Sequence, residues 1–350
     1  MSGGVDSSVT AALLKKQGYD VIGITMQLLP KEEQQQSACC NLHAVSDAKR
    51  VAHALGIPHY TVNLRDPFKT HVIDPFLAQY QAGFTPNPCV ECNRYIKFDE
   101  LFKMAAELDA DYIATGHYVK VTYSPKSGTY RLKKADDTHK DQSYFLYMLT
   151  SDQLRRIKFP LARLEKPAVR ELARGLRFVN ADKSDSQEIC FVTSKNYADF
   201  IEERLTDDQK KAGDIVHLNG TVMGRHTGIH RYTIGQRKGL GIAHPEPLYV
   251  IRIDAKTNTV IVGEQGALRV KTLSLARFVL SNPNERIVGK SFSIKTRYQM
   301  TPISCRVTAH DHDTAVVELL TTQEFISPGQ SGVLYDRDRV VGGGIIVSTQ

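Results

Sequence analysis

The amino-terminal half of the chain alternates between helix-like and strand-like patterns of apolar residues. Apolar side chains recur at helical spacing in three stretches, which predicts amphipathic helices at 7–17, 44–55 and 97–108. Three further runs are typical of buried strands: DVIGIT (20–25), HYTVNL (59–64) and DYIATG (111–116). Because strands that alternate with helices pair in parallel, we predict an α/β domain with a doubly wound parallel sheet covered on both faces.

From about residue 213 the pattern changes to short β-rich segments separated by glycines. Residues 254–258 are typical of a hairpin turn between two apolar runs, and no convincing amphipathic helix follows. We therefore expect three domains: the α/β domain at 1–195, a small β-rich domain at 196–268 and a β-barrel at 269–350. Within the first domain, residues 122–142 are expected to form a mobile excursion.

The length of the chain, 350 residues, is enough for two or three domains that each bury a core. No apolar run is long enough to cross a bilayer, and no charged-then-apolar leader is found. We therefore expect a cytoplasmic protein with no membrane association.

Positive charge is concentrated in one part of the sequence. The whole chain carries a formal charge of +7, but residues 221–310 contain 14 Lys and Arg against four acidic residues, a net +10 that leaves −3 for the rest. Because phosphate neutralisation dominates affinity for nucleic acids, this excess favours a polyanionic partner. A solvated basic face is the alternative, and charge alone leaves both open.

A string of small polar residues, MSGGVDSS, precedes the first predicted helix. Its glycines let the backbone approach a phosphate, and the helix directs its free N–H groups and positive dipole end towards the anion. Asp6 and Ser7 are candidates to cap this helix. A Walker A loop would end in Gly-Lys-Ser/Thr, and no such lysine follows. The loop is instead similar to the SGGxDS signature of ATP pyrophosphatases, which split ATP between the α and β phosphates and adenylate a substrate oxygen.

The cysteines are too few for a disulfide scaffold, so we expect thiols, ligands or catalysts at Cys39, Cys40, Cys89, Cys92, Cys190 and Cys305. Cys89 and Cys92 form a C-x-x-C pair, with basic residues after it that favour the thiolate. The pair is also half of a zinc site, for which Cys39 and Cys40 would supply poor spacing. A thioredoxin-like role fits badly because the motif does not begin a helix directly after a strand. Taken alone, Cys190 is typical of an inert buried cysteine.

The sequence as a whole resembles the bacterial tRNA-specific 2-thiouridylases (the MnmA/TrmU family of the PP-loop ATP pyrophosphatase superfamily). The matching motifs run from end to end in the expected order: SGGVDSS (2–8), TPNPCVECN (85–93), ATGHY (114–118), KDQSYFLY (140–147), ICF (189–191), TIGQRKGLGI (233–242), KTRY (295–298), PGQS (328–331) and GGGII (342–346). The resemblance implies that ATP, with Mg²⁺ expected beside it, adenylates the C2 oxygen of the wobble uridine of certain tRNAs. Sulfur then displaces AMP and leaves 2-thiouridine.

The resemblance also implies a role for individual residues. Cys190 would carry the sulfur as a persulfide, and Cys92 would release it, ending in a Cys92–Cys190 disulfide that needs reduction. The ATP pocket would comprise Ser2, Gly3, Gly4, Val5, Asp6, Ser7, Ser8, Met26 and Gly116. The target base would face Asn87, Pro88 and Cys89. The tRNA contacts would be Lys140, Asp141, Gln142, Arg297 and Tyr298, with the central β-rich domain taking part in tRNA recognition.

Two departures from the family pattern matter. Some members have aspartate where this chain has Cys89, so a carboxylate cannot act from that position, and Cys89 becomes an auxiliary candidate. As an alternative, three thiolates (Cys89, Cys92 and Cys190) would ligate an iron–sulfur cluster. In addition, the family has a short apolar strand before the loop, which this sequence lacks. We expect a start codon placed downstream of the natural one, and the other interpretation is a shortened copy with weaker ATP binding.

Three functions remain open at this point: the tRNA sulfurtransferase, another ATP pyrophosphatase such as an amide-forming ligase, and an inactive tRNA-binding copy. For the first, the resemblance implies tRNAs with Lys, Glu and Gln acceptors and an upstream persulfide donor, a cysteine desulfurase or relay protein. Without apolar heptads, we expect a monomer.

Overall fold

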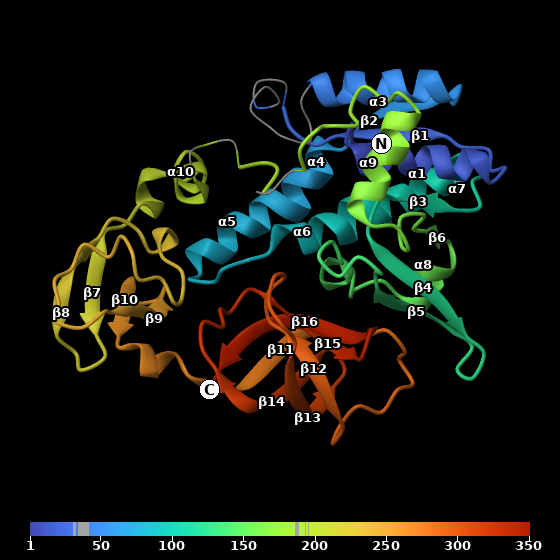
Figure 1. The fold of residues 1–350 in the computed structure, drawn as a ribbon. Coiled ribbons are helices and arrows are strands. Elements are labelled where there is room, and N and C mark those ends of the chain that lie inside the picture. The colour runs from blue at the N-terminus through green and yellow to red at the C-terminus, as the bar shows by residue number, and fades with distance from the viewer. Residues whose placement is uncertain (31–32, 34–41, 186–188, 193, 195) are drawn as a thin grey trace. The chain divides into compact units, whose positions relative to one another are not determined.

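The structure is a computed structural model that describes residues 1–350 except 31–32, 34–41, 186–188, 193 and 195 (Figure 1). Cys39 and Cys40 therefore lie outside the described residues. The chain divides into two units: unit 1 comprises residues 1–72, 89–193 and 338–340, and unit 2 comprises 73–88, 194–337 and 341–350. Among the helices described, none has the length and apolar character needed to span a membrane.

Two pairs of parallel strands lie in unit 1. Strand β1 (Gly23–Gln27) pairs with β2 (His59–Asn63), with Gly23 opposite His59. Strand β3 (Ile113–Ala114) pairs in the same way with β6 (Ile157–Lys158). Helices separate these strands in sequence, so the predicted α/β class with parallel pairing is confirmed.

The helices of this part of the chain follow the predicted periodicity. The helical segments are α1 (Val5–Lys16), α3 (Leu42–Leu55), α4 (Arg65–Phe68), η1 (Lys69–Ile73), α6 (Pro88–Glu91), η2 (Cys92–Glu100), α7 (Leu101–Glu107), η3 (Ser143–Phe145), α8 (Ser151–Arg155) and α9 (Lys166–Gly175). Helices α1, α3 and α9 share a core in which Val9, Val51 and Val169 are fully buried. The helix predicted at 97–108 is present, but its first turns are π-helical.

A β-hairpin occupies much of the stretch predicted as a mobile excursion. Strand β4 (Val119–Ser124) pairs antiparallel with β5 (Thr129–Lys134), with Gly128 at φ +66° in the turn. Val119 and Leu132 are fully buried. The sequence did not predict this hairpin, in which two widely spaced apolar side chains anchor an otherwise polar stretch.

In unit 2 a four-stranded sheet has the order β8-β7-β10-β9. Its strands are β7 (Gly213–His217), β8 (Val222–His226), β9 (Tyr249–Asp254) and β10 (Thr259–Gly263). The β9–β10 hairpin turns where the sequence predicts it, with Asn258 at φ +51°. The helical segments of the unit are α5 (Asp74–Gln81), α10 (Tyr197–Glu202), η4 (Asp207–Gln209), η5 (Ile229–Arg231) and η6 (Gln265–Leu268).

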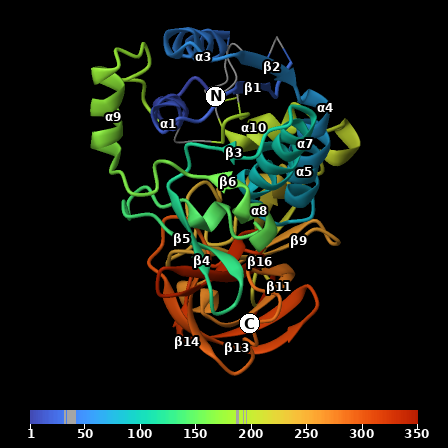
Figure 2. The same cartoon turned by 90° about the vertical axis from the view of Figure 1, so that its right-hand side faces the viewer.

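A closed barrel follows, formed by unit 2 except for the first two residues of its last strand (Figure 1 and Figure 2). Its strands are β11 (Val270–Leu280), β12 (Ser291–Lys295), β13 (Ile303–Asp311), β14 (Thr314–Gln323), β15 (Ser331–Asp336) and β16 (Arg339–Thr349). The order is β11-β14-β13-β12-β15-β16, and pairing of β11 with β16 closes the ring, which confirms the predicted barrel. Closure leaves no free edge among these strands, and Val317, Leu334 and Ile346 fill the interior.

Candidate active site

The loop of residues 2–8 leads directly into α1. Gly4 precedes the helix with extended backbone (φ −91°, ψ 161°), and no side chain caps it, so the expectation that Asp6 or Ser7 does so was wrong. The Ser7 and Ser8 hydroxyls instead donate to the Gly4 carbonyl oxygen at 3.1 and 3.0 Å. A helix start without a side-chain cap leaves its first N–H groups to an anion or to water.

Two glycines permit close packing around this loop. Gly3 has φ +72°, and a Cβ there would lie 2.2 Å from the carbonyl oxygen of Ala44. A Cβ on Gly116 would lie 2.8 Å from the carbonyl carbon of Asp6. A side chain at either position would collide with neighbouring backbone, so both positions require glycine.

Residues 180–183, which precede Cys190 in sequence, donate hydrogen bonds to the loop of residues 2–8. The Asn180 side-chain amide donates to the Gly3 carbonyl oxygen at 3.1 Å and to the Ser8 hydroxyl at 2.9 Å. Lys183 donates to the same Gly3 oxygen at 3.3 Å and to Asp47 at 3.1 Å. Asn180 and Lys183 were not predicted as site residues, because their only signal in the sequence is their place shortly before the ICF motif.

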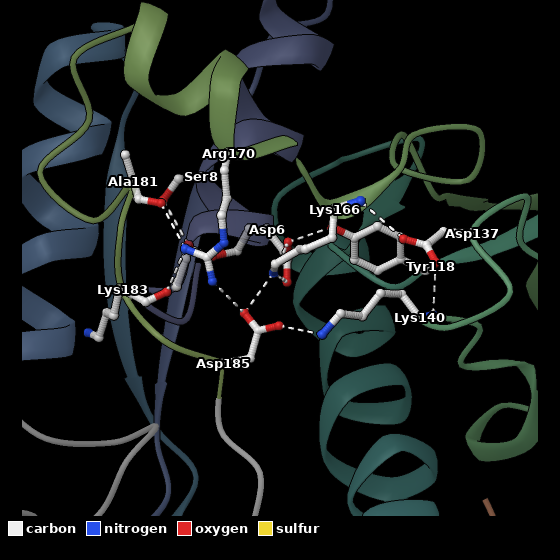
Figure 3. A network of polar contacts seen from close by, with 12 residues as sticks. Asp6, Ser8, Tyr118, Asp137, Lys140, Lys166, Arg170, Ala181, Lys183 and Asp185 are labelled. Carbon is white, nitrogen blue, oxygen red and sulfur yellow. Dashed lines mark hydrogen bonds and ion pairs between the residues drawn. The ribbon is translucent and has the colours of Figure 1, made fainter. Parts of the chain in front are cut away.

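The carboxylate of Asp6, in the loop of residues 2–8, forms an ion pair with Lys166 (Figure 3). The Lys166 ammonium, at the start of α9, donates to both Asp6 carboxylate oxygens at 2.7 Å, and the Tyr118 hydroxyl donates to one of them at 2.8 Å. Burial, followed by the charge of Asp6, raises the pKa of Tyr118 far above its ordinary value, so the phenol remains a donor. Lys166 also lies 5.9 Å from the centre of the Tyr118 ring.

Asp185 is the second carboxylate of this network (Figure 3). Its oxygens lie 2.7 Å from Lys140, 2.7 Å from Lys166 and 3.3 Å from Arg170. Burial raises the pKa of Asp185, but hydrogen bonds from Lys140 and Lys166 outweigh it and hold the pKa below its ordinary value. Lys166 therefore bridges Asp6, in the loop of residues 2–8, and Asp185, which lies five positions before Cys190.

Arg170 strengthens the same connection from the next turn of α9. Its guanidinium donates to the carbonyl oxygens of Ala181 and Lys183 at 3.0 Å each. Lys166 and Arg170 are four residues apart and therefore lie on one helix face. Residues 181–185 are held against α9 by backbone and side-chain contacts together.

Among the predicted tRNA contacts of unit 1, only Lys140 presents a charge to this network. Asp141 is buried, and its carboxylate accepts from the Ala135 amide at 3.1 Å and the Ser143 hydroxyl at 2.8 Å. The Gln142 side chain accepts from the Tyr118 amide at 3.0 Å. These contacts show that Asp141 and Gln142 position the backbone around Tyr118.

The cysteines of the two motifs differ in exposure. Cys89 is exposed in α6, Cys92 is buried at the start of η2, and Cys190 is half-buried. Cys190 lies in a turn closed by a 3.0 Å bond from the Val192 amide to the Ile189 carbonyl.

One short helix supports both cysteine segments. Phe191, beside Cys190, packs edge-on against Phe68 of α4, with ring centres 5.6 Å apart. Helix η2, which begins at Cys92, packs against the same α4. In the described part of the chain, no group of three His, Cys, Asp or Glu side chains is arranged to hold a metal ion, so the iron–sulfur alternative gains no support here.

The other predicted site residues belong to other elements of the chain. Met26 is half-buried in β1 opposite Val62, and Asn87 and Pro88 immediately precede Cys89. In unit 2, Arg297 is exposed after β12, and the Lys295 ammonium lies 5.8 Å from the centre of the Tyr298 ring.

The fold and the loop define an α/β nucleotide-binding type of protein with two following β-domains. In agreement, the family "tRNA methyl transferase HUP domain" matches residues 1–194, "tRNA methyl transferase PRC-barrel domain" matches 198–264, and "Aminomethyltransferase beta-barrel domain" matches 270–346.

Two relatives are similar over nearly the whole chain. The tRNA-specific 2-thiouridylase MnmA of Heliobacterium modesticaldum is 46% identical over 99% of this chain and 91% of its own length. The protein of the same name from Carboxydothermus hydrogenoformans is 47% identical over 99% of this chain and 96% of its own length. The chain therefore belongs to the tRNA-specific 2-thiouridylase (MnmA) family.

Among solved structures, the U34-tRNA thiolase NcsA of Methanococcus maripaludis is 19% identical over 60% of this chain and 66% of its own, with a TM-score of 0.34.

Proposed function

We propose that this chain is an ATP-dependent tRNA-uridine 2-sulfurtransferase that converts the wobble uridine, position 34, to 2-thiouridine. Relatives named tRNA-specific 2-thiouridylase, 46–47% identical over 99% of the chain, support the activity. The structural observation that carries the proposal is the bond network joining the loop of residues 2–8 to residues 180–185, which lead to Cys190.

ATP is the substrate that the loop accommodates. Its phosphates would lie against residues 2–8 at the uncapped start of α1, with Met26 and Gly116 completing the pocket. The fit is supported by Gly3 and Gly116, where any Cβ would collide with neighbouring backbone. Mg²⁺ is expected to accompany the ATP phosphates. The C2 oxygen of the uridine attacks the α-phosphorus, the bond between the α and β phosphates breaks, and pyrophosphate leaves.

Sulfur transfer then uses the two cysteines supported by α4. The terminal sulfur of a Cys190 persulfide attacks C2 of the adenylated uridine, and AMP leaves. The Cys92 thiolate attacks the Cys190 sulfur, so the bond to the transferred sulfur breaks and a Cys92–Cys190 disulfide forms. A two-electron thiol reductant returns both cysteines to thiols, and an upstream persulfide donor, a desulfurase or relay protein, reloads Cys190.

The tRNA contacts belong to the same proposal. Asn87, Pro88 and Cys89 would face the target base, and Lys140, Arg297 and Tyr298 would contact the tRNA directly. Asp141 and Gln142 belong to the same set of tRNA contacts, and their side chains also hold the backbone next to Lys140. The expected acceptors are tRNAs for Lys, Glu and Gln, bound by one protein molecule each.

The test is mass spectrometry of nucleosides from tRNA incubated with the protein, ATP, Mg²⁺ and a persulfide source. We expect 2-thiouridine with the wild-type chain and none with Cys190→Ser. The matched control is Cys305→Ser, because Cys305 is a fully buried barrel residue and its loss leaves both cysteine motifs intact.

Formation of AMP and pyrophosphate decides between the proposal and the other functions. Release that depends on tRNA supports the sulfurtransferase, whereas release that depends on a small molecule and not on tRNA would identify another ATP pyrophosphatase. Binding of tRNA without any turnover would identify an inactive tRNA-binding protein.

A further inference from the structure

A loop in unit 2, residues 233–241, contains two adjacent cations that the site described above does not use. We call residues 233–241 the basic loop. Arg237 and Lys238 are exposed at its tip. Across the described part of the chain, no hydrogen bond or ion pair uses the Arg237 guanidinium or the Lys238 ammonium. Their charges are therefore available to a partner outside the protein.

Backbone hydrogen bonds anchor the first half of the basic loop to β9. The Gly235 amide donates to the Val250 carbonyl oxygen at 2.8 Å, and the Val250 amide donates to the Gln236 carbonyl oxygen at 2.9 Å. Gly235 has φ +85°, and a Cβ there would lie 2.6 Å from the ring of Phe325. This stem therefore has a defined conformation that depends on glycine.

The Gln236 side chain fixes the tip itself. Its carbonyl oxygen accepts from the Thr233 amide at 3.0 Å, and its NH₂ donates to the Lys238 carbonyl oxygen at 3.0 Å. On the far side, Leu240 is buried in the core of the four-stranded sheet. The loop is thus held at both ends and across its middle, while its two charged side chains extend into solvent.

We propose that Arg237 and Lys238 bind backbone phosphates of the tRNA substrate, an inference that rests on the function proposed above. A preorganised loop loses little conformational entropy on binding, and two unpaired cations gain affinity by releasing counterions from the polyanion. The excess of positive charge in residues 221–310 is complementary to a polyanionic partner, and the tRNA of the proposed function is such a polyanion. Since phosphate contacts carry no sequence information, the basic loop strengthens binding of all tRNAs alike.

The test compares tRNA binding by the full chain and by Arg237→Ala/Lys238→Ala, using fluorescence anisotropy from about 50 to about 200 mM salt. Removal of two phosphate contacts should reduce the slope of log K against log salt by about two and raise Kd about tenfold at low salt. The fold-change should be equal for a tRNA that becomes thiolated and one that does not.

Two further variants complete the test. Lys210→Ala/Lys211→Ala removes the same charge elsewhere in unit 2 and should leave the slope of the wild type. Arg237→Gln/Lys238→Gln keeps polar side chains without the charges. It should reduce the slope of log K against log salt by the same amount as the alanine pair. The proposal would be overturned if both loop variants kept the wild-type slope. It would also be overturned if the Lys210/Lys211 control reduced the slope as much as the loop variants do.

The outcome also separates this proposal from the proposed function. If the wild-type chain forms 2-thiouridine but the loop variants bind tRNA normally, only the role of the basic loop is wrong. If the wild-type chain neither binds nor thiolates tRNA, the proposed function is wrong, and the basic loop loses its partner with it.

Discussion

The Lys166 ammonium donates to both carboxylate oxygens of Asp6 at 2.7 Å, across 160 positions of sequence. The same ammonium lies 2.7 Å from Asp185 and is itself almost fully buried. One cation therefore compensates two carboxylates, one in the loop proposed to bind ATP and one in the segment leading to Cys190.

Replacement of Lys166 by Met should weaken both stability and turnover. Among the described residues, Asp6 would keep Tyr118 as its hydrogen-bond donor, and Asp6 and Asp185 would lose the cation that they share. Because Asp6 and Asp185 are partly solvated, we expect a loss of about 1–3 kcal/mol in the free energy of unfolding. Urea unfolding measures that loss, and tRNA-dependent pyrophosphate release should fall about tenfold. Lys166→Arg, which keeps the charge, should recover most of the stability, and a Met variant equal to the wild type would contradict the prediction.

Gly3→Ala should destabilise the chain far more than Gly18→Ala. Both glycines have positive φ, +72° and +86°, but only the Cβ at position 3 meets another group, the Ala44 carbonyl oxygen at 2.2 Å, while nothing lies within 4 Å at position 18. Strain alone should cost about 1 kcal/mol at Gly18, and the added clash should bring the cost at Gly3 to about 3 kcal/mol or more. Equal shifts of the urea midpoint would show that the loop relaxes freely.

The cysteines should differ sharply in their reaction with iodoacetamide. Cys89 is exposed, whereas Cys305 is fully buried and burial raises the pKa of its thiol to about 12. Since the thiolate is the reactive form, brief labelling at about pH 8 followed by peptide mass spectrometry should find Cys89 modified and Cys305 intact. Cys305 should become modified only after unfolding in guanidinium. Comparable labelling of both thiols in the native protein would be inconsistent with a buried Cys305.

Stability should fall in mild acid because of His117. Burial, followed by the charge of Lys97, lowers the pKa of His117 well below its ordinary value. Below about pH 6.5 the unfolded chain binds a proton on this ring that the folded chain does not, so the free energy of unfolding decreases as pH falls.

The slope from this one group is at most about 1.4 kcal/mol per pH unit. His117→Gln should remove this slope. The difference in free energy of unfolding between the wild type and the variant should therefore change between about pH 7.5 and about pH 5.5, as measured by urea unfolding at each pH. Parallel stability curves for the two proteins would contradict the prediction.

Local pattern was sufficient for much of the fold. The helices α1 and α3 and the strands β1 and β2 lie within a few residues of their predicted positions, because their periodicity depends only on neighbours along the chain. The β9–β10 turn was located for the same reason. The hairpin β4–β5 was not predicted, because its two fully buried apolar residues, Val119 and Leu132, are widely spaced in the sequence and show no clear period.

The candidate site was predicted less completely. Motifs led to the loop of residues 2–8 and to the cysteine pair, but not to Lys166, Asn180 or Arg170, which lie outside any conspicuous motif. The structure also shows hydrogen bonds of the side chains of Asp141 and Gln142 with nearby protein groups, which no spacing rule reveals.

By itself, the sequence determined the helices and strands with a clear apolar period, the loop of residues 2–8 with its two glycines and the cysteine pattern, since each depends on residue type and short-range spacing. Only the tertiary structure decided which charges meet. Asp6 has Lys166 and Tyr118 as partners, and Asp185 has Lys140, Lys166 and Arg170, because the path of the chain brings α9 and residues 181–185 beside α1. Pairing between distant charges depends on that path, and no local pattern specifies it.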